Sequence, residues 1–425
     1  MLAAAQPSVG DVLWPYAGVF VVALVGALLL SPVMRMLALR NGIIDWPNVQ
    51  RKEHARPVAY LGGVAIFLGW LAGVAVSYAI EPHMHAIDGT GSAHVSFPIG
   101  IVVGAALVMF TGLFDDLYGV SPRVKVGGQL LAGAALASEH VGLELAESSL
   151  SLLHLPTGEA VVAAVGTVAI ALFVMGGCNA MNLLDGLDGL ASGVTAIGCL
   201  GLLVIAGIVA MRAQGGEAMG GSVALDDPVR LTLLLAALGA VLGFLPFNLN
   251  PARIFMGDAG SLLLGFLMVT AILLLGDVSG AGPRLVTAAL LVFAVPIVDT
   301  TLAILRRTMR GQAFFHADSE HLHHMLCRAG LSVWQSVAVL YGAAVGFAVL
   351  GCTLVALDLR WRYVMAVCVA VFVLAVLAAY KWSRRQWMPG RPAPDAAPAA
   401  AGQTGQGLHL PPQREGKAEV GSSGK

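Results

Sequence analysis

Long apolar runs dominate the chain, and charged residues gather in the short stretches between them. A helix that spans a membrane needs roughly 20 consecutive, mostly apolar residues. The pattern therefore predicts an all-α polytopic membrane protein with about eleven transmembrane helices. The predicted helices cover residues 17–38, 59–80, 97–114, 124–141, 160–178, 190–211, 231–247, 261–276, 285–305, 333–357 and 361–380. The segments 124–141 and 261–276 are the weakest, because they are short or interrupted by glycine.

The two ends of the chain need separate interpretation. Residues 1–388 are predicted to form one integral membrane domain. Residues 389–425 are rich in Ala, Pro, Gly and Gln, so they lack apolar surface to bury and are predicted to be a disordered tail. The first apolar run has no positively charged stretch before it and continues to Arg35 and Arg40 without a clear cleavage site. We therefore expect a retained span rather than a signal peptide.

Lysine and arginine are distributed unequally between the loops. When the loops are assigned alternately to the two sides of the membrane, 14 of these cations fall on one side and 5 on the other. The richer side carries Arg40, Arg51, Lys52, Arg56, Arg123, Lys125, Arg253, Arg306, Arg307, Arg310, Arg328, Lys381, Arg384 and Arg385. The poorer side carries Arg212, Arg230, Arg284, Arg360 and Arg362. Cytoplasmic loops carry the excess of Lys and Arg, so we expect a periplasmic N-terminus and a cytoplasmic C-terminus.

Composition narrows the class of protein further. Hydrophobic residues make up 57% of the 425 residues and charged residues 12%, whereas a soluble domain has about 25% charged residues. The formal net charge of -1 argues against nucleic acid as a partner. The five cysteines show no CxxC spacing, which disfavours a disulfide framework or a zinc site. A transporter, a channel, a scaffold and a membrane enzyme remain open.

Carboxylates and histidines gather on the side that the cations identify as cytoplasmic. These residues are Asp45, Asp115, Asp116, Asp185, Asp188, Asp258, Asp318, His54, His316, His321, His323 and His324. Because Lys and Arg alone define the sidedness, this clustering is a separate observation. It favours an enzyme, since a secondary transporter would place polar residues near mid-membrane within inverted repeats, and the sequence shows no internal repeat.

Two acidic motifs follow apolar runs. Asp115 and Asp116 end the run MFTGLFDDLYG, and adjacent acids at a membrane boundary are costly without a counter-charge. Metal binding or proton transfer would compensate them, and a solvated helix end is the alternative. In NAMNLLDGLDGLASG, Asn182, Asp185 and Asp188 are spaced three apart, so we expect all three on one face of a helix.

The third acidic motif, FNLNPARIFMGDAGSLLLG, places Asp258 at the start of an apolar helix. This acid either holds a metal ion that bridges to an anion or merely N-caps the helix. Oxygen ligands with few competing thiols suit Mg²⁺ or Mn²⁺. Since Mg²⁺ usually completes its shell with water and substrate phosphates, the acids point to phosphoryl transfer on a nucleotide or diphosphate.

Two loops supply the cations that a phosphoryl-transfer site needs. DWPNVQRKEHARPVAYLGG carries Lys52 and Arg56, and RRTMRGQAFFHADSEHLHHMLCRAGLS carries His321, His323 and His324. Anion contacts or a general acid role are favoured over zinc for the histidines, because no Cys or HExxH pattern accompanies them.

Asp299, in FAVPIVDTTLAILRR, differs from the other acids because it lies within a predicted span. An intramembrane acid indicates function by default. A structural contact to an Arg or His of the neighbouring loop is the alternative, and the sequence does not decide between them.

The order of these motifs resembles the polyprenyl-phosphate N-acetylhexosamine-1-phosphate transferase family, glycosyltransferase family 4. The similarity rests on FDDLYG, NAMNLLDGLDGLASG, FNLNPARIFMGDAGSLLLG, VPIVDT and ADSEHLHHMLCRAGLS, in this order over roughly residues 40–330. The first basic loop and the SEHLHH loop are most similar to the branch that uses UDP-GlcNAc, the undecaprenyl-phosphate alpha-N-acetylglucosaminyl 1-phosphate transferases. The resemblance implies transfer of GlcNAc-1-phosphate from UDP-GlcNAc to undecaprenyl phosphate, with release of UMP.

The resemblance also implies a cofactor, a location and partners. The family requires Mg²⁺ or Mn²⁺ and works at the cytoplasmic face of the bacterial inner membrane, where the lipid bilayer holds the acceptor. Its products start O-antigen, common-antigen or related surface glycans. Open alternatives are another UDP-N-acetylhexosamine, UDP-MurNAc-pentapeptide or, in a different class, a secondary transporter. A homodimer is an open alternative to a monomer.

Roles are carried over by position. The resemblance makes Asp258 and Asn182 the metal ligands, and it makes Asp115, supported by Asp116, the base or the contact to the lipid phosphate. Asp185 and His321 complete the predicted catalytic set. The predicted substrate contacts are Lys52, Arg56, Asp188, Asn248, Phe255, His323 and His324, of which Asp188, Asn248 and Phe255 hold the nucleotide. A single in-line attack and a two-step route through an aspartyl-phosphate both remain open.

Overall fold

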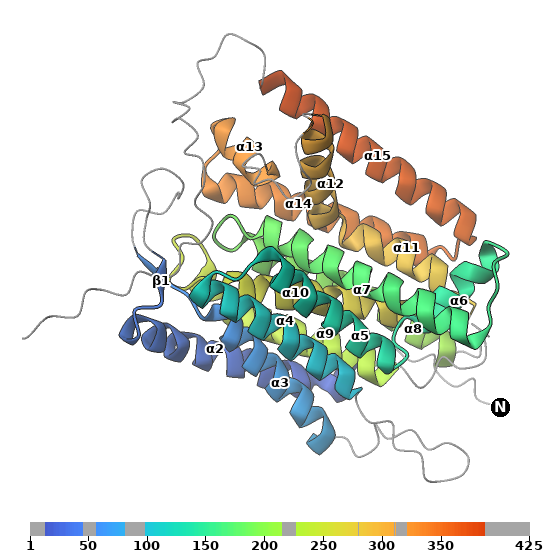
Figure 1. Cartoon of the computed structure of the whole chain (residues 1–425), viewed down its shortest axis with the longest axis horizontal. Helices are drawn as coiled ribbons and strands as arrows, with labels where there is room; N and C mark the ends of the chain where they lie inside the picture. Colours follow the sequence, from blue (N-terminus) through green and yellow to red (C-terminus); the bar gives the residue numbers. More distant parts are fainter. Residues whose placement is uncertain are drawn as a thin grey trace, which may run out of the picture.

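A computed structural model describes residues 13–45, 57–80, 98–214, 227–278, 280–309, 311 and 321–386. Over these residues nearly all regular structure is helical, and long helices lie side by side in one bundle (Figure 1). The predicted all-α class is therefore confirmed. Lys52, Arg56 and the predicted tail from residue 389 lie outside the described residues.

The described elements follow one another along the chain as helices, interrupted by one small sheet. The first of them are η1 (Trp14–Tyr16), α2 (Ala17–Arg40), β1 (Ile44–Asp45), β2 (Val58–Ala59), α3 (Gly62–Ile80), α4 (Ile99–Tyr118), α5 (Pro122–Ser138), α6 (Leu143–Leu152) and α7 (Glu159–Leu184). The others are α8 (Leu190–Gln214), α9 (Asp227–Asn248), α10 (Gly257–Gly276), α11 (Gly282–Val292), α12 (Ala294–Met309), α13 (Leu322–Arg328), α14 (Val333–Ala356) and α15 (Trp361–Gln386). β1 and β2 pair antiparallel, and Ala59 of β2 also bridges to Ile254, just before α10.

Within the described residues, eight helices are long and apolar enough to cross a membrane, or up to nine if the bent pair α11 and α12 is one span. The eight are α2 with η1, α4, α7, α8, α9, α10, α14 and α15. The chain is therefore a multi-pass membrane protein. Helix length and composition do not confirm the predicted number of eleven. The segment 59–80 contains only a shorter apolar helix, Gly62–Ser77, and α5 has 17 residues and begins with Arg123 and Lys125 in its first turn.

The predicted span 285–305 is broken, so its prediction as one continuous helix is wrong. α11 ends at Val292 and α12 begins at Ala294, with a bend of 76° between them. Pro296 explains the break, because proline has no N–H to donate to the carbonyl of Val292 and is tolerated only in the first turn of a new helix. The bend gives α12, which carries Asp299, a direction of its own.

α10 lies inside the bundle, where α3, α4, α7, α8 and α9 pack around it (Figure 1). Every residue of α10 except Asp258 is buried. A Cβ on Gly265 would lie 2.5 Å from the carbonyl oxygen of Gly177, so α7 and α10 touch through glycine. The glycines that weaken the segment 261–276 as a predicted span are thus part of close helix packing, and a helix that is apolar on all sides is typical of a buried position.

α4 continues beyond the apolar run that predicts it. The predicted span ends at residue 114, but the helix ends at Tyr118 and closes on Gly119, whose φ of 65° is left-handed. Asp115 and Asp116 therefore lie in the last turn of α4 and not in a loop. The difference arises because hydropathy marks the apolar part of a helix and not a polar turn that extends it.

α7 also extends beyond its predicted end at residue 178. It runs to Leu184, so Asn182 lies in its last turn and Asp185 is the C-cap. Residues 185–189 form a turn, and Gly189, with a φ of 79°, closes it before α8. The expectation that Asn182, Asp185 and Asp188 share one helical face is therefore wrong, because the helix ends between them.

Candidate active site

The end of α4 meets the start of α10, and Asp116 joins them. Its carboxylate accepts the backbone N–H groups of Asp258, at 2.8 Å, and of Ala259, at 3.1 Å. The first N–H groups of a helix have no partner within the helix, so Asp116 caps α10 from a neighbouring helix. Gly257, with a φ of 67°, makes this contact possible, because a Cβ there would lie 2.4 Å from the carboxylate of Asp116. Asp116 thereby fixes the backbone that carries Asp258.

The alternative that Asp258 merely N-caps its helix is wrong. The N-cap of α10 is Met256, and Asp258 lies in the first turn while Asp116 does the capping. The carboxylate of Asp258 instead meets side chains from two other helices. Lys125 of α5 contacts its Oδ2, and Asn182 of α7 donates to its Oδ1 at 2.7 Å. Three helices therefore converge on this one carboxylate.

Lys125 lies between acids of α4 and α10. Its ammonium group is 3.0 Å from Oδ2 of Asp115 and contacts Oδ2 of Asp258. The other oxygen of Asp115 accepts the N–H of Val120 at 2.9 Å. Sequence reasoning counts Lys125 only as a cation of the cytoplasmic side. A signal for more was available, because Lys125 and Arg123 are the cations that directly follow the paired acids of FDDLYG.

Two further groups, Asp185 and Tyr60, belong to this cluster. Burial, together with the charges of Asp258, Asp116 and Asp188, raises the pKa of Asp185 to about 8. Burial and the charges of Asp116, Asp258 and Asp185 also hold the pKa of Tyr60 well above its usual value, so its hydroxyl keeps its proton. Sequence reasoning missed Tyr60, because one tyrosine after a basic loop carries no distinguishing signal.

Where these helices meet, four carboxylates and the ammonium group of Lys125 lie close together, so negative charge exceeds positive charge. The carboxylates belong to Asp115, Asp116, Asp185 and Asp258. The raised pKa of Asp185 indicates uncompensated negative charge nearby, which a bound cation relieves. In the part of the chain that the structure describes, no three His, Cys, Asp or Glu residues are grouped to hold a metal ion. Mg²⁺ does not need such a group, because it takes one or two carboxylates and fills its shell with water and phosphates. The carboxylate of Asp258 and the side-chain oxygen of Asn182 fit that requirement.

Asp188, predicted to contact the nucleotide, holds the loop between α9 and α10. Its Oδ2 accepts the side-chain N–H of Asn250 and the backbone N–H of Ala252, both at 2.9 Å. Two donors on one carboxylate oxygen fix this loop against the turn that follows α7. The contact of Asp188 with a uracil stays a prediction.

Asn248 and Phe255 border the same loop. Asn248 is 3% exposed; its side-chain oxygen accepts the hydroxyl of Ser192 at 2.8 Å, and its side-chain N–H donates to the carbonyl of Ile254 at 3.2 Å. Both ends of the amide are engaged inside the protein, so in this structure Asn248 shapes the loop. Phe255 is half-buried, and its ring centroid lies 6.0 Å from that of Tyr60 at an angle of 58°. Direct nucleotide contacts of Asn248 and Phe255 stay predictions.

Asp299 holds the start of the histidine segment, residues 321–324. It is fully buried in α12, its Oδ2 is 2.9 Å from Nδ1 of His321, and its Oδ1 accepts the N–H of Leu322 at 2.7 Å. The sequence leaves open whether Asp299 is functional or makes a structural contact to an Arg or His of the neighbouring loop. The structure shows the contact to a histidine. A functional role through that histidine stays open on this geometry.

The three histidines lie against one another but differ in exposure. His321 is 5% exposed and His323 1%, whereas His324 is half-buried. The rings of His321 and His323 are nearly parallel with centroids 5.7 Å apart, and the rings of His323 and His324 are 4.2 Å apart. Burial, reinforced by His324, lowers the pKa of His323 to about 3, so this imidazole is neutral. Neither of its ring nitrogens has a hydrogen-bond partner among the described residues.

The carboxylates of Asp115, Asp116, Asp185 and Asp258 form the acid cluster, and the histidine segment touches it at Gly186. A Cβ on Gly186 would lie 2.1 Å from Nε2 of His323, so only glycine lets these two segments meet as they do. Gly186 directly follows Asp185 in the turn after α7. The structure thus brings the described site residues into two adjoining groups. The first contains Asp115, Asp116, Asn182, Asp185, Asp188, Asn248, Phe255 and Asp258, and the second contains His321, His323 and His324.

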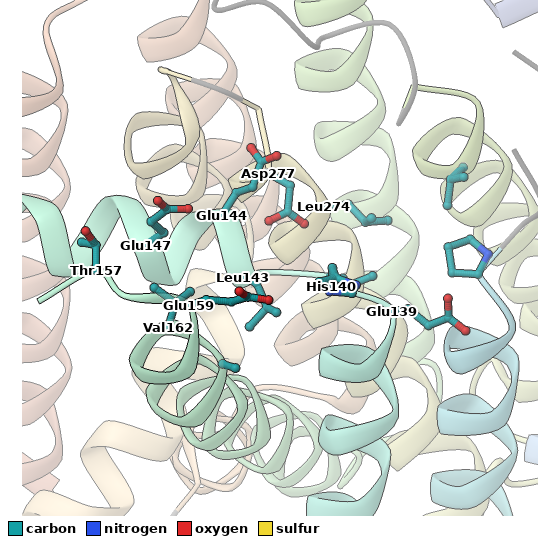
Figure 2. Close-up of a pocket in the computed structure, with 14 residues that line it drawn as sticks. Glu139, His140, Leu143, Glu144, Glu147, Thr157, Glu159, Val162, Leu274 and Asp277 are labelled. Carbon is teal, nitrogen blue, oxygen red and sulfur yellow. The ribbon is translucent and has the colours of Figure 1, made fainter. Parts of the chain in front are cut away.

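A cavity of about 560 Å³ lies near the other end of the bundle and contains none of these residues (Figure 2). Its lining comes mainly from the segment around α6 and the end of α10, and α6 lies far from β1 and α13 in Figure 1. The acidic members of the lining are Glu139, Glu144, Glu147, Glu159 and Asp277. The candidate active site is therefore the junction of α4, α5, α7 and α10 with α13, and not this cavity.

Residues 98–276 match the family model described as glycosyl transferase family 4. This match contains the motifs that carry Asp115, Asn182, Asp185, Asp188 and Asp258. It ends before α12 and α13, so the histidine segment lies outside it.

Curated relatives cover most of the chain. It is 33% identical over 323 residues to the probable undecaprenyl-phosphate N-acetylglucosaminyl 1-phosphate transferase of Bacillus subtilis, covering 76% of this chain and 80% of that protein. It is 31% identical over 330 residues to the decaprenyl-phosphate N-acetylglucosaminephosphotransferase of Mycolicibacterium smegmatis, covering 72% and 74%. It is 29% identical over 366 residues to the undecaprenyl-phosphate alpha-N-acetylglucosaminyl 1-phosphate transferase of Yersinia pestis, covering 84% and 89%.

Proposed function

Because this chain belongs to glycosyl transferase family 4 and is a phosphoglycosyl transferase, we propose that it transfers GlcNAc-1-phosphate from UDP-GlcNAc to undecaprenyl phosphate and releases UMP. The relatives' names support a polyprenyl phosphate acceptor and an N-acetylglucosaminyl phosphate donor group. One observation carries the proposal. Asp258 meets Lys125 and Asn182 at one end of an apolar bundle, so a charged site lies next to helices that suit a lipid.

Asp258 and Asn182 are the proposed ligands of a Mg²⁺ or Mn²⁺ ion. When bound, the ion supplies positive charge that offsets the diphosphate of the donor and the phosphate of the leaving UMP. Asn182 donates to Asp258 and, at 2.9 Å, to Oγ of Ser261, so its amide is anchored beside the carboxylate. If the side-chain amide of Asn182 rotated by about 180°, its oxygen instead of its N–H group would face the carboxylate of Asp258 and could bind a cation there.

The reaction is a single in-line displacement at the sugar-linked phosphorus. An oxygen of the lipid phosphate forms a bond to that phosphorus, and the bond from the same phosphorus to the bridging oxygen of UMP breaks. A dianionic lipid phosphate and a dianionic UDP-sugar give a dianionic lipid diphosphate-sugar and dianionic UMP. The charges balance without a net proton transfer, so the site must mainly align two anions and reduce their repulsion.

Asp115 and Lys125 have roles that follow from this balance. A phosphate monoester has a second pKa near about 6, so the acceptor is mostly ionised at pH 7 and needs no strong base. Asp115 positions the acceptor or takes its residual proton. Lys125, which lies between Asp115 and Asp258, offers the ammonium group that meets the phosphates.

The other residues are proposed to support the same reaction. Asp116 and Asp185 complete the catalytic centre beside Asp258, and His321 serves it from the histidine segment. The proposed substrate contacts are Asp188, Asn248 and Phe255 at the nucleotide, and Lys52, Arg56 and His324 at the diphosphate and sugar, with the buried His323 beside His324.

We also propose that the protein crosses the bacterial inner membrane with its N-terminus in the periplasm and its active site at the cytoplasm. The excess of Lys and Arg on the loops of the candidate site supports this orientation. The product would then start a surface glycan such as O-antigen on the cytoplasmic side, where the nucleotide sugar is available.

Purified protein in detergent tests the proposed function. The mixture contains undecaprenyl phosphate, Mg²⁺ and one of several UDP-sugars, and UMP release is measured over time. We expect UMP from UDP-GlcNAc at a higher kcat/KM than from UDP-GalNAc or UDP-MurNAc-pentapeptide. If no UDP-N-acetylhexosamine releases UMP, the proposal is wrong. GlcNAc-phosphate retained on an aspartate after incubation with UDP-GlcNAc alone would instead establish the two-step route.

The metal proposal has a readout besides activity. Asp258→Asn and Asp115→Asn should each abolish turnover without loss of expression. Only Asp258→Asn should also remove the rise in melting temperature that Mn²⁺ and UDP-GlcNAc together give the wild type, because ligand binding stabilises the folded state. An unchanged rise in Asp258→Asn would exclude Asp258 as a metal ligand.

A further inference from the structure

The three histidines of the histidine segment are not equivalent in the structure. His321 and His323 are 5% and 1% exposed, while His324 is half-buried. A side chain that touches a substrate needs accessible surface, and of these three only His324 has a substantial share of it. The sequence predictions place His321 in the catalytic set and His323 and His324 among the substrate contacts, so the exposure pattern calls for a different division of roles.

Asp299 engages two successive residues where α13 begins. One oxygen meets Nδ1 of His321 at 2.9 Å, and the other accepts the backbone N–H of Leu322 at 2.7 Å. Asp299 belongs to α12, so one buried carboxylate fixes α13 to another helix. α13 has 7 residues, and so short a helix has little stability of its own and depends on tertiary contacts for its position.

His323 supplies the second contact that places α13. Its buried ring lies against Gly186, in the turn after α7, and it makes no hydrogen bond through either nitrogen within the described residues. A neutral imidazole without partners acts here as a spacer between α13 and the turn. His324 is the next residue, and its ring centroid is 4.2 Å from that of His323.

We propose that Asp299 is a positioning residue that, through His321 and the first N–H of α13, presents His324 to the substrate, and that His324 alone of the three histidines contacts it. The recognised group is a phosphate oxygen of the nucleotide sugar, because an imidazole N–H is a donor for an anionic oxygen. This inference rests on the proposed function. It makes Asp299, an acid inside an apolar helix, part of the active site without any contact to substrate.

Two substitutions of Asp299 separate positioning from simple loss of structure. Asp299→Ala removes both contacts to α13. Asp299→Asn keeps them, because its oxygen can accept the N–H of Leu322 while its NH₂ group donates to Nδ1 of His321 in the other tautomer. If Asp299 acts by positioning, Asp299→Asn should therefore keep most of the activity that Asp299→Ala loses.

The test measures UMP release from UDP-GlcNAc by wild type, Asp299→Ala, Asp299→Asn, His324→Asn and the double variant Asp299→Ala/His324→Asn. We expect His324→Asn to lose at least about 100-fold in kcat/KM, the effect typical of removing one donor to a reacting anion. Asp299→Ala should lose about 10- to 100-fold through misplacement, and Asp299→Asn less than about 5-fold. The double variant should match His324→Asn within about 3-fold, because Asp299 acts only through the placement of His324.

Asp277 provides the matched control. It is also a buried carboxylate, 9% exposed, and it accepts the backbone N–H of Gly142 at 2.7 Å near the other end of the bundle. Asp277→Ala should lower the melting temperature and leave the rate within about 2-fold of wild type. Asp299→Ser, which is too short to reach His321, replaces Asp299→Ala in the cycle if the alanine variant is not recovered as a folded protein.

The outcomes are distinct. Losses that multiply in the double variant, or wild-type rates in Asp299→Ala or His324→Asn, would overturn the inference while the proposed function stands. Absence of UMP release by the wild type would overturn the proposed function itself.

Discussion

At the scale of single residues, Lys125 is the group on which the site's charge depends. It contacts carboxylates from α4 and α10, and its side chain is 18% exposed. A cation in such a position holds the two acids together, and in the proposed reaction it also offers an ammonium group to incoming phosphates. Lys125 therefore belongs to the candidate active site as much as the acids of the three motifs.

Replacement of Lys125 by methionine should reduce kcat by about 100-fold or more, because the long side chain stays but the charge that meets the phosphates is lost. UMP release from UDP-GlcNAc measures the effect. Arg123→Met is the matched control, since Arg123 is exposed in the same first turn of α5 and should keep its rate within about 2-fold. Equal losses in both variants would mean that the effect is general surface charge and not Lys125.

Sequence motifs predict the residue types of the site better than their partners. Asp115, Asn182 and Asp258 come from three separate motifs, and they do meet around one cluster. Tyr60 escapes prediction, because one tyrosine after a basic stretch has no distinctive pattern. The place of Lys125 after the paired acids marks it as a cation of the site but does not show which carboxylates it contacts. Their roles depend on which helices pack together, and no local pattern states that.

At the scale of elements, the turn 185–189 between α7 and α8 is held from several sides. The hydroxyl of Tyr341, on α14, donates to the carbonyl of Gly189 at 2.6 Å. Asp188 binds the loop before α10, and Gly186 lies against His323 of α13. The turn is therefore the point where the C-terminal helices are connected to the acid cluster.

Gly186→Ala should disturb this connection. The added methyl group would lie 2.1 Å from Nε2 of His323, whose ring is 1% exposed and has little room to move away. We expect a loss of about 10-fold or more in kcat and a lower melting temperature. The double variant Gly186→Ala/His323→Ala should recover part of both, because the smaller residue at 323 removes the clash. No recovery would show that the contact with His323 is not the cause.

Hydropathy predicts most of the helices but not their ends or breaks. α4 and α7 each extend past their apolar runs into polar turns, and these turns carry Asp115, Asp116 and Asn182. The bend before Ala294 follows from Pro296 in an otherwise continuous apolar segment, so only the proline signals it. The candidate site residues lie in these places because the ends of membrane-spanning helices are where charged side chains can reach water.

At the scale of the whole molecule, the bundle has two different ends. The acid cluster and the histidines lie at the end near β1 and α13, and the acidic cavity around α6 lies at the other (Figure 1). The predicted orientation places the first end at the cytoplasm, where a soluble nucleotide sugar is found.

This orientation can be tested with single cysteines in a chain whose five native cysteines are replaced by alanine. Residue 360 is exposed and directly precedes α15. The thiol of Arg360→Cys should react with a membrane-impermeant maleimide in intact spheroplasts. Arg123→Cys, at the start of α5, should react only after the membrane is opened. The reverse pattern would place the active site outside the cell and contradict the proposed location.

The contact between Lys125 and Asp258 has a consequence for the order of events during turnover. The ammonium group and the proposed divalent cation would compete for the carboxylate of Asp258. The donor's diphosphate offers Lys125 another anion, so arrival of the donor would draw the ammonium group away and leave Asp258 to the ion. Ion and donor should then bind cooperatively, and because such coupling is reciprocal, each should lower the Kd of the other by the same factor.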